Sequence, residues 1–106
     1  MSTRDELRLL ITQLKNKIAL ADAVARLNNH PDFRLVFLNH TNKELPLQLV
    51  NEMSRYKLGS EEHNDLVSQL DHVSFIQAHL TNLIDEGQIA EQDLREAQAI
   101  PDSELN

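Results

Sequence analysis

Two runs of residues with alternating spacings of four and three constrain this chain more than any other feature of its sequence. One run is Leu7, Ile11, Leu14, Ile18, Ala21 and Ala25, and the other is Leu66, Leu70, Val73, Gln77, Leu80 and Ile84. A spacing of about 3.5 residues places each run along one side of a helix, and it is typical of long helices that pack at a shallow angle. The sequence therefore predicts two long, heptad-patterned helices that pair with each other.

Cap signals suggest where these two helices begin and end. Thr3 opens a Thr-x-x-Glu sequence, which has the spacing of a capping box, and Ser60 precedes the second run. We expect Gly87 to end the second long helix, because glycine readily adopts the left-handed conformation found after helix C-termini. A short acidic helix is then expected over 88–99, followed by a mobile polar tail at 101–106.

The stretch LNNHPDF, residues 27–33, separates the first long helix from the middle of the chain. Asn28 and Asn29 tolerate the left-handed conformation that ends a helix, and the proline that comes after His30 favours extended backbone there. Pro31 suits the first turn of a new helix. We therefore interpret this stretch as a corner between helices and not as a catalytic pair of His30 and Asp32.

Shorter amphipathic segments occupy the middle of the chain. A short helix is expected over 33–40, and another is expected to begin between 42 and 46, since Pro46 fits the start of a helix better than its interior. Leu45, Leu49, Met53 and Tyr56 share one face of the latter. Gly59 then offers a residue free to take positive φ after the helix.

The composition favours the all-α class. The only aromatic residues are Phe33, Phe37, Tyr56 and Phe75, and the chain has two glycines, fewer than a sandwich or barrel needs for its turns. At 106 residues, the chain is expected to form a single helical domain, residues 1–106, in which four to five helices make an elongated hairpin or bundle. A helix over 3–28 alone would be about 39 Å long.

Charge is divided unevenly along the chain, whose net charge is −7. Residues 1–57 contain nine Lys or Arg and six Asp or Glu, whereas residues 58–106 contain one and eleven. The halves should attract each other, either within one molecule or between two, and the sequence leaves both open. The acidic balance argues against direct nucleic-acid binding. No apolar run reaches the roughly 20 residues that cross a bilayer, so we expect no membrane contact.

The residues that could carry chemistry do not form a recognisable site. The chain has five histidines and no cysteine. His40 and Glu44 have the spacing of helical metal ligands but flank the expected helix break, and His72 and His79 lie two turns apart. We therefore expect no enzyme, no cofactor and no metal, and a small metallo-hydrolase remains a competing hypothesis that would require a bound metal.

A protein-binding surface is the better supported hypothesis. The candidate interaction residues lie on the two apolar runs and on the short helix between them: Leu7, Ile11, Leu14, Ile18, Phe33, Phe37, Leu66, Leu70 and Val73. The same residues suit an internal core, which the sequence does not separate from an interface. A homo-oligomer or a larger assembly would cover whatever the chain leaves exposed.

One resemblance adds a biological setting. The segments Asn29-His30-Pro31-Asp32-Phe33-Arg34, Val36-Phe37-Leu38 and Leu49-Val50 resemble a family of small helical proteins from tailed bacteriophages, encoded among virion structural genes. The resemblance covers roughly residues 20–90. His30 departs from the pattern because it stands between the asparagine and the proline, and Asn39-His40-Thr41 replaces an aromatic-containing turn.

The resemblance implies a virion or head-assembly component, held by a larger coat or connector protein in the virion or the host cytoplasm. The alternative is an acidic phage inhibitor of a basic host nucleic-acid-binding protein, in which residues 58–106 imitate phosphate charge.

Overall fold

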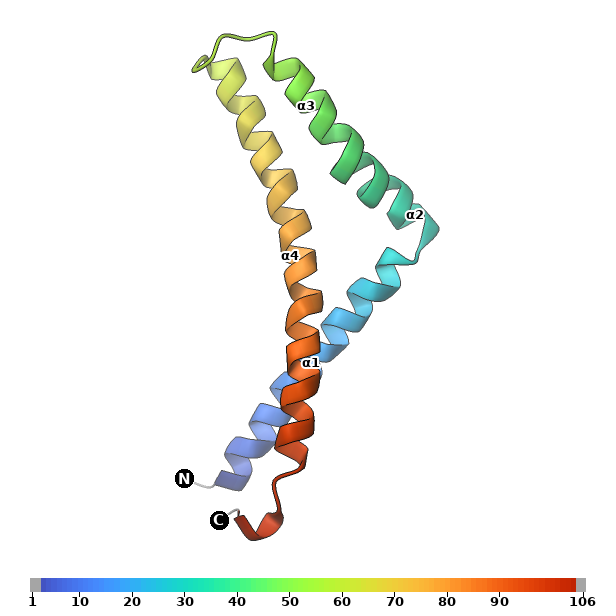
Figure 1. The fold of residues 1–106 in the computed structure, drawn as a ribbon, viewed down its shortest axis with the longest axis vertical. Coiled ribbons are helices and arrows are strands. Elements are labelled where there is room, and N and C mark those ends of the chain that lie inside the picture. Colours follow the sequence, from blue (N-terminus) through green and yellow to red (C-terminus); the bar gives the residue numbers. More distant parts are fainter. Residues whose placement is uncertain (1–2, 105–106) are drawn as a thin grey trace. The chain divides into compact units, whose positions relative to one another are not determined.

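Every regular element of the protein is helical in the computed structural model, which describes residues 3–104. In chain order these elements are α1 (Thr3–Asn28), α2 (Pro31–Phe33), the π-helix η1 (Arg34–Glu44), α3 (Leu45–Met53), α4 (Glu61–Gln98) and the 3₁₀ turn η2 (Asp102–Glu104) (Figure 1). The all-α prediction is confirmed. The expected mobile tail includes η2 and two residues outside the described part, so its mobility stays a prediction.

The chain divides into two compact units. One consists of Met1–Ala25 with Asn82–Asn106, and the other is Arg26–Thr81. Helix α4 contributes residues 82–98 to the first unit and residues 61–81 to the second. Each unit has its own buried side chains and is described in turn; the single domain expected over 1–106 stays a prediction.

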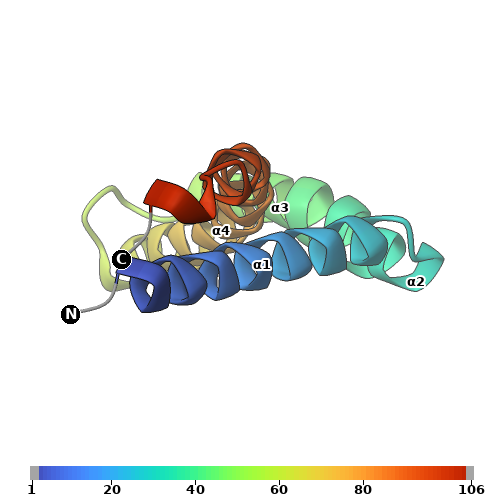
Figure 2. The same cartoon turned by 90° about the horizontal axis from the view of Figure 1, so that it is seen from below.

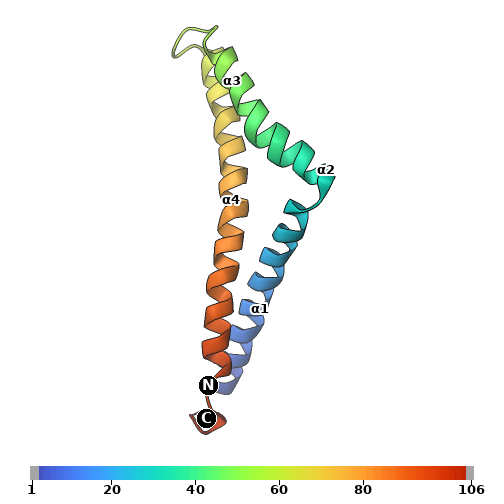
Figure 3. The ribbon, with the colours of Figure 1, turned by 45° about the vertical axis from the view of Figure 1, so that its right-hand side comes forward.

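In the first unit, α1 lies beside residues 82–98 of α4 (Figures 2 and 3). Leu14 and Val24 of α1 are buried, as are Ala90 and Ala97 of α4. The buried side chains of α4 are thus smaller than those of α1, and the size of the side chains at a contact sets how closely two helices approach. Val24 is buried where the sequence pattern had placed Ala25, which is exposed.

Gly87 does not end a helix, so that prediction is wrong. It lies inside α4, is buried, and would bring an added Cβ into collision with the Cβ of Ala21. The same Cβ would lie 3.6 Å from the carbonyl oxygen of Lys17. Gly87 therefore serves the close approach of α1 and not a left-handed helix end. The separate final helix expected over 88–99 is likewise wrong, because α4 continues to Gln98.

In the second unit, Leu49 of α3 and Leu66 and Val73 of α4 are buried. Helices α2, η1 and α3 succeed one another without interruption from Pro31 to Met53, so the predicted break between residues 40 and 46 is wrong. The helix continues because η1 shifts to the π register: the N–H of Leu45 donates to the carbonyl of His40, five residues earlier. Pro46, which has no N–H, comes directly after this bond.

The π-helix keeps a four-residue repeat on one side. Phe33, Phe37, Thr41, Leu45, Leu49 and Met53 are each four residues apart, and all are buried or half-buried. In an α-helix, four residues turn about 40° past a full circle, so six such positions would wind around the helix. The wider turn of η1 takes up part of this excess. The rings of Phe33 and Phe37 stack with centroids 5.0 Å apart.

The corner between α1 and α2 is confirmed in most respects. His30 has extended backbone (φ −77°, ψ 124°), its Nδ1 accepts the N–H of Asp32 at 3.2 Å, and Pro31 opens α2. The expected left-handed asparagines are wrong, since no non-glycine residue in the described part has positive φ. Instead the N–H of Asn29 donates to the carbonyl of Arg26, which tightens the last turn in the 3₁₀ manner.

The start of α4 agrees with the sequence prediction. The backbone N–H of His63 donates to the hydroxyl oxygen of Ser60 at 3.2 Å, so Ser60 caps the helix as expected. Gly59 has a φ of 85°, which confirms its positive φ. However, α3 already ends at Met53, so Gly59 belongs to the connection before α4 and does not directly follow the C-terminus of a helix.

Candidate interaction surface

Among the described residues, the one ion pair between a histidine and a carboxylate lies on the surface. The Nδ1 of His40 lies 3.1 Å from the Oε2 of Glu44, and both side chains are more than half exposed. The structure brings these residues together because η1 replaces the expected break. Residues 3–104 contain no cluster of three or more His, Asp or Glu side chains that could hold a metal ion.

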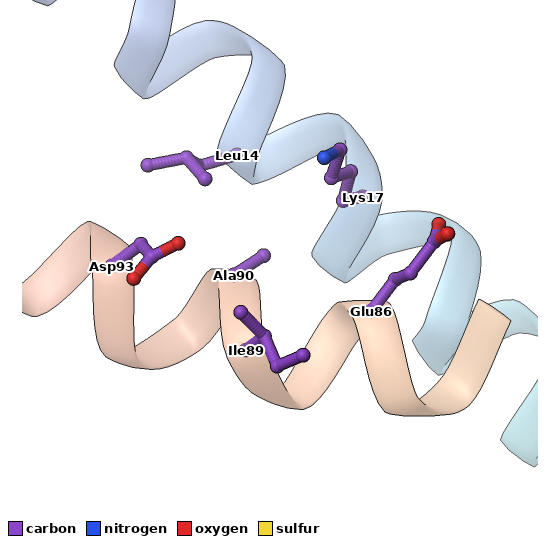
Figure 4. Close-up of a pocket in the computed structure, with 6 residues that line it drawn as sticks. All are labelled: Leu14, Lys17, Glu86, Ile89, Ala90 and Asp93. Carbon is purple, nitrogen blue, oxygen red and sulfur yellow. The ribbon is translucent and has the colours of Figure 1, made fainter. Parts of the chain in front are cut away.

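A hollow between α1 and α4 in the first unit is small. It has a volume of about 210 Å³, and Figure 4 shows Leu14 and Lys17 of α1 on one side of it and Glu86, Ile89, Ala90 and Asp93 of α4 on the other. Sites for drug-sized ligands usually occupy about 300–1,000 Å³ and are mostly apolar. This hollow therefore does not indicate a small-molecule site.

Exposed apolar side chains are the more informative feature. Among the described residues, fourteen large hydrophobic side chains are exposed, whereas seven hydrophobic residues are buried. Single exposed leucines are normal on soluble proteins, so the number alone does not define a site. The informative property is whether they line up along one side of a helix.

The outer face of α1, which we define as Leu9 and Leu20, meets this condition. Leu9 is 61% exposed and Leu20 is 50% exposed. They are eleven residues apart, and eleven residues complete just over three whole turns, so the two leucines form one row. Arg4 and Lys15 form a second row with the same spacing, about 120–140° around the helix from the leucines.

The acidic face of α4, which we define as Asp85, Ile89 and Glu96, combines an exposed apolar residue with two carboxylates. Ile89 is 62% exposed, and Asp85 and Glu96 lie on either side of it along the helix. These two carboxylates are also eleven residues apart. Within the described part of the chain, the only ion pair is that of His40 with Glu44, so Asp85 and Glu96 have no ion-pair partner there, although Glu96 accepts a hydrogen bond from the side chain of Gln92 at 3.5 Å.

The candidate residues taken from the sequence lie on the inner sides of the two units. Leu14, Leu66 and Val73 are buried, and the half-buried ones are Leu7, Ile11, Ile18, Phe33, Phe37 and Leu70. Their contact with a partner stays a prediction. Sequence reasoning missed the outer face of α1 and the acidic face of α4, although the repeated eleven-residue spacing was visible in the sequence.

Comparisons with protein-family models, curated proteins and solved structures find no match to this chain. In the part of the chain that the structure describes, no helix combines the length and apolarity needed to span a membrane.

Proposed function

We propose that this chain is a non-enzymatic bacteriophage structural or head-assembly protein that binds other proteins through helical faces. The observation that carries the binding role is the outer face of α1, where Leu9 and Leu20 are exposed in one row along the helix. Leucines in a row on a helix are the usual anchors of a helix-in-groove or helix-on-helix contact. The resemblance around Asn29–Arg34 supplies the phage setting.

The proposal names a larger coat or connector protein as partner, in the virion or in the host cytoplasm. It also includes coiled-coil-like packing of the two long helices along the positions spaced by three and four residues. A second copy of the chain is a further candidate partner.

Mass spectrometry of purified virions and proheads tests this function. We expect the protein to be present at a defined stoichiometry relative to the coat protein, and its absence from both particles would refute the proposal. In particles assembled with the variant Leu20→Asp, we expect reduced incorporation, because the charge would have to be buried in the contact. Ala19→Asp, at an exposed position of the same helix about 100° around from Leu20, is the matched control.

An acidic inhibitor of a basic host protein is the second candidate function. The exposed carboxylates of Glu61, Glu62 and Asp65 in the first turns of α4 favour it, since none of them has an ion-pair partner in the described residues. It predicts binding to a basic nucleic-acid-binding protein that weakens as salt rises. Charge reversal of these three residues that left such binding unchanged would contradict it.

A further inference from the structure

We infer that the exposed side of the continuous helix formed by η1 and α3 pairs with the same side of a second copy of this chain, with the two helices antiparallel. The inference rests on the proposed function, because it names the partner of one helical face. It concerns the second unit alone. The face that carries it depends on the π register of η1.

The four-residue repeat sorts the side chains of this helix into an inner and an outer side. The inner row is buried or half-buried at every position and consists of Phe33, Phe37, Thr41, Leu45, Leu49 and Met53. Since four residues return the chain to the same side here, two residues bring it to the opposite side. The row two residues further on, which we call the outer row, is accordingly exposed at every position: Leu35, Asn39, Lys43, Leu47 and Asn51.

The π register brings the two leucines of the outer row onto one side of the helix. Leu35 is 64% exposed and Leu47 is 68% exposed. They are twelve residues apart, and in an uninterrupted α-helix this spacing would place them about 120° apart around the axis. The wider turn of η1 reduces this angle. Because π-helical segments occur frequently at functional sites, the alignment of the two leucines points to a contact surface.

The outer row matches itself when a second copy is turned end to end. In a two-fold contact between identical chains, residue i meets residue j and residue j meets residue i. Leu35 of each copy then meets Leu47 of the other, and Asn39 meets Lys43. Both leucine contacts form together, because the same two residues set the spacing on each copy.

Charge selects the antiparallel orientation. Lys43 is the only charged residue of the outer row. In a parallel pairing the two copies of Lys43 would face each other, and like charges across an interface are unfavourable. In the antiparallel pairing each lysine faces Asn39, whose amide oxygen is an acceptor for the ammonium group. Beside the row, Glu44 already pairs with His40 of its own chain at 3.1 Å, so the centre of the face has no excess of charge that favours a strongly charged partner.

Light scattering of the full chain tests the inference with the variants Leu35→Lys and Leu47→Glu. We expect the wild type to approach twice the monomer mass as its concentration rises. Each variant alone should associate at least about tenfold more weakly, because its introduced charge faces a leucine at both ends of the contact. An equimolar mixture should associate again, since the introduced carboxylate of one chain then faces the introduced ammonium of the other, and Leu35 faces Leu47 at the other end. A parallel pairing would leave both introduced charges opposite leucines.

Leu58→Glu changes an exposed leucine in the connection before α4 and is the matched control, which should associate like the wild type. Circular dichroism of each variant checks that the helices remain folded. The double variant with Leu35→Lys and Leu47→Glu in one chain should associate through two charge pairs, and it keeps the test decisive if a single variant does not fold.

Three results would overturn the inference. They are a wild type that is still monomeric at about 1 mM, single variants that associate like the wild type, and a mixture and double variant that both stay monomeric. Presence in virions is measured separately, so a failure here is distinguishable from a failure of the proposed function.

Discussion

Replacing Gly87 by alanine tests the close helix contact of the first unit. In the middle of a solvent-exposed helix this change stabilises by about 1 kcal/mol, because glycine loses more backbone freedom on folding than alanine. At position 87 the new Cβ would collide with the Cβ of Ala21. That atom is attached directly to the backbone and has no alternative rotamer, so the helices must move apart.

The expected result is a loss of stability. Forcing an extra carbon into a well-packed contact costs about 1–3 kcal/mol. Against the gain in helix propensity, Gly87→Ala should lower the free energy of unfolding by up to about 2 kcal/mol. Each kcal/mol corresponds to a decrease in Tm of roughly 4–8 °C for a domain near this size. Urea and thermal unfolding followed by circular dichroism measure both quantities.

A double-mutant cycle isolates the contact. Ala21→Gly removes the opposing Cβ, so Gly87→Ala should become neutral or stabilising in that background, with a coupling energy of about 1–3 kcal/mol. Ala78→Gly, at an exposed position of α4, calibrates the propensity term and should cost about 1 kcal/mol. If Gly87→Ala stabilises the protein by about 1 kcal/mol and shows no coupling to Ala21, the reasoning is refuted.

Three further predictions concern local features of the second unit. Ser60→Ala should lower the unfolding free energy by about 1 kcal/mol through loss of the helix cap, whereas Ser68→Ala, on the exposed surface of α4, should not; equal effects in urea titrations would contradict the cap. Gly59→Ala should cost about 1–2 kcal/mol because its φ is 85°, and Gly59→Asn should cost less; thermal melts that rank them in the opposite order would argue against this conformation. Thr41→Val removes the 2.9 Å bond from its hydroxyl to the carbonyl of Val36 and should cost about 0.5–1.5 kcal/mol, with faster amide hydrogen exchange in η1; unchanged exchange would show that this bond does not support the π register.

Local signals in the sequence predicted those features that depend on neighbouring residues. The cap at Ser60 depends on a hydroxyl and an N–H three residues apart, and the corner at His30 depends on the proline next to it. The spacing also placed Leu7, Ile11, Leu14 and Ile18 on one side of α1, because residues three and four apart share a helix face. In the cap and the corner, residues close in the chain provide all the atoms involved, so local spacing is sufficient.

The sequence could not reveal features that depend on distant residues. Gly87 follows the second apolar run, where a helix end is expected. Its role is instead to allow close contact with Ala21, which is far away in the chain and adjacent in the folded unit. The prediction of a helix break before Pro46 was wrong for a related reason. The π register changes which side chains share one face of the helix. The packing of Phe37, Leu45 and Leu49 on that face selects this register.

The candidate interaction surface also combines features that the sequence determines with features that depend on distant residues. The sequence by itself determined that the chain is helical, that its apolar residues recur along helix faces, and that its first half is basic and its second half acidic. Only the tertiary structure decided that Leu14 and Ala90 become buried while Leu9 and Ile89 stay exposed. The physical reason is that several helix faces carry apolar residues, and the close approach permitted by Gly87 selects which of them is buried.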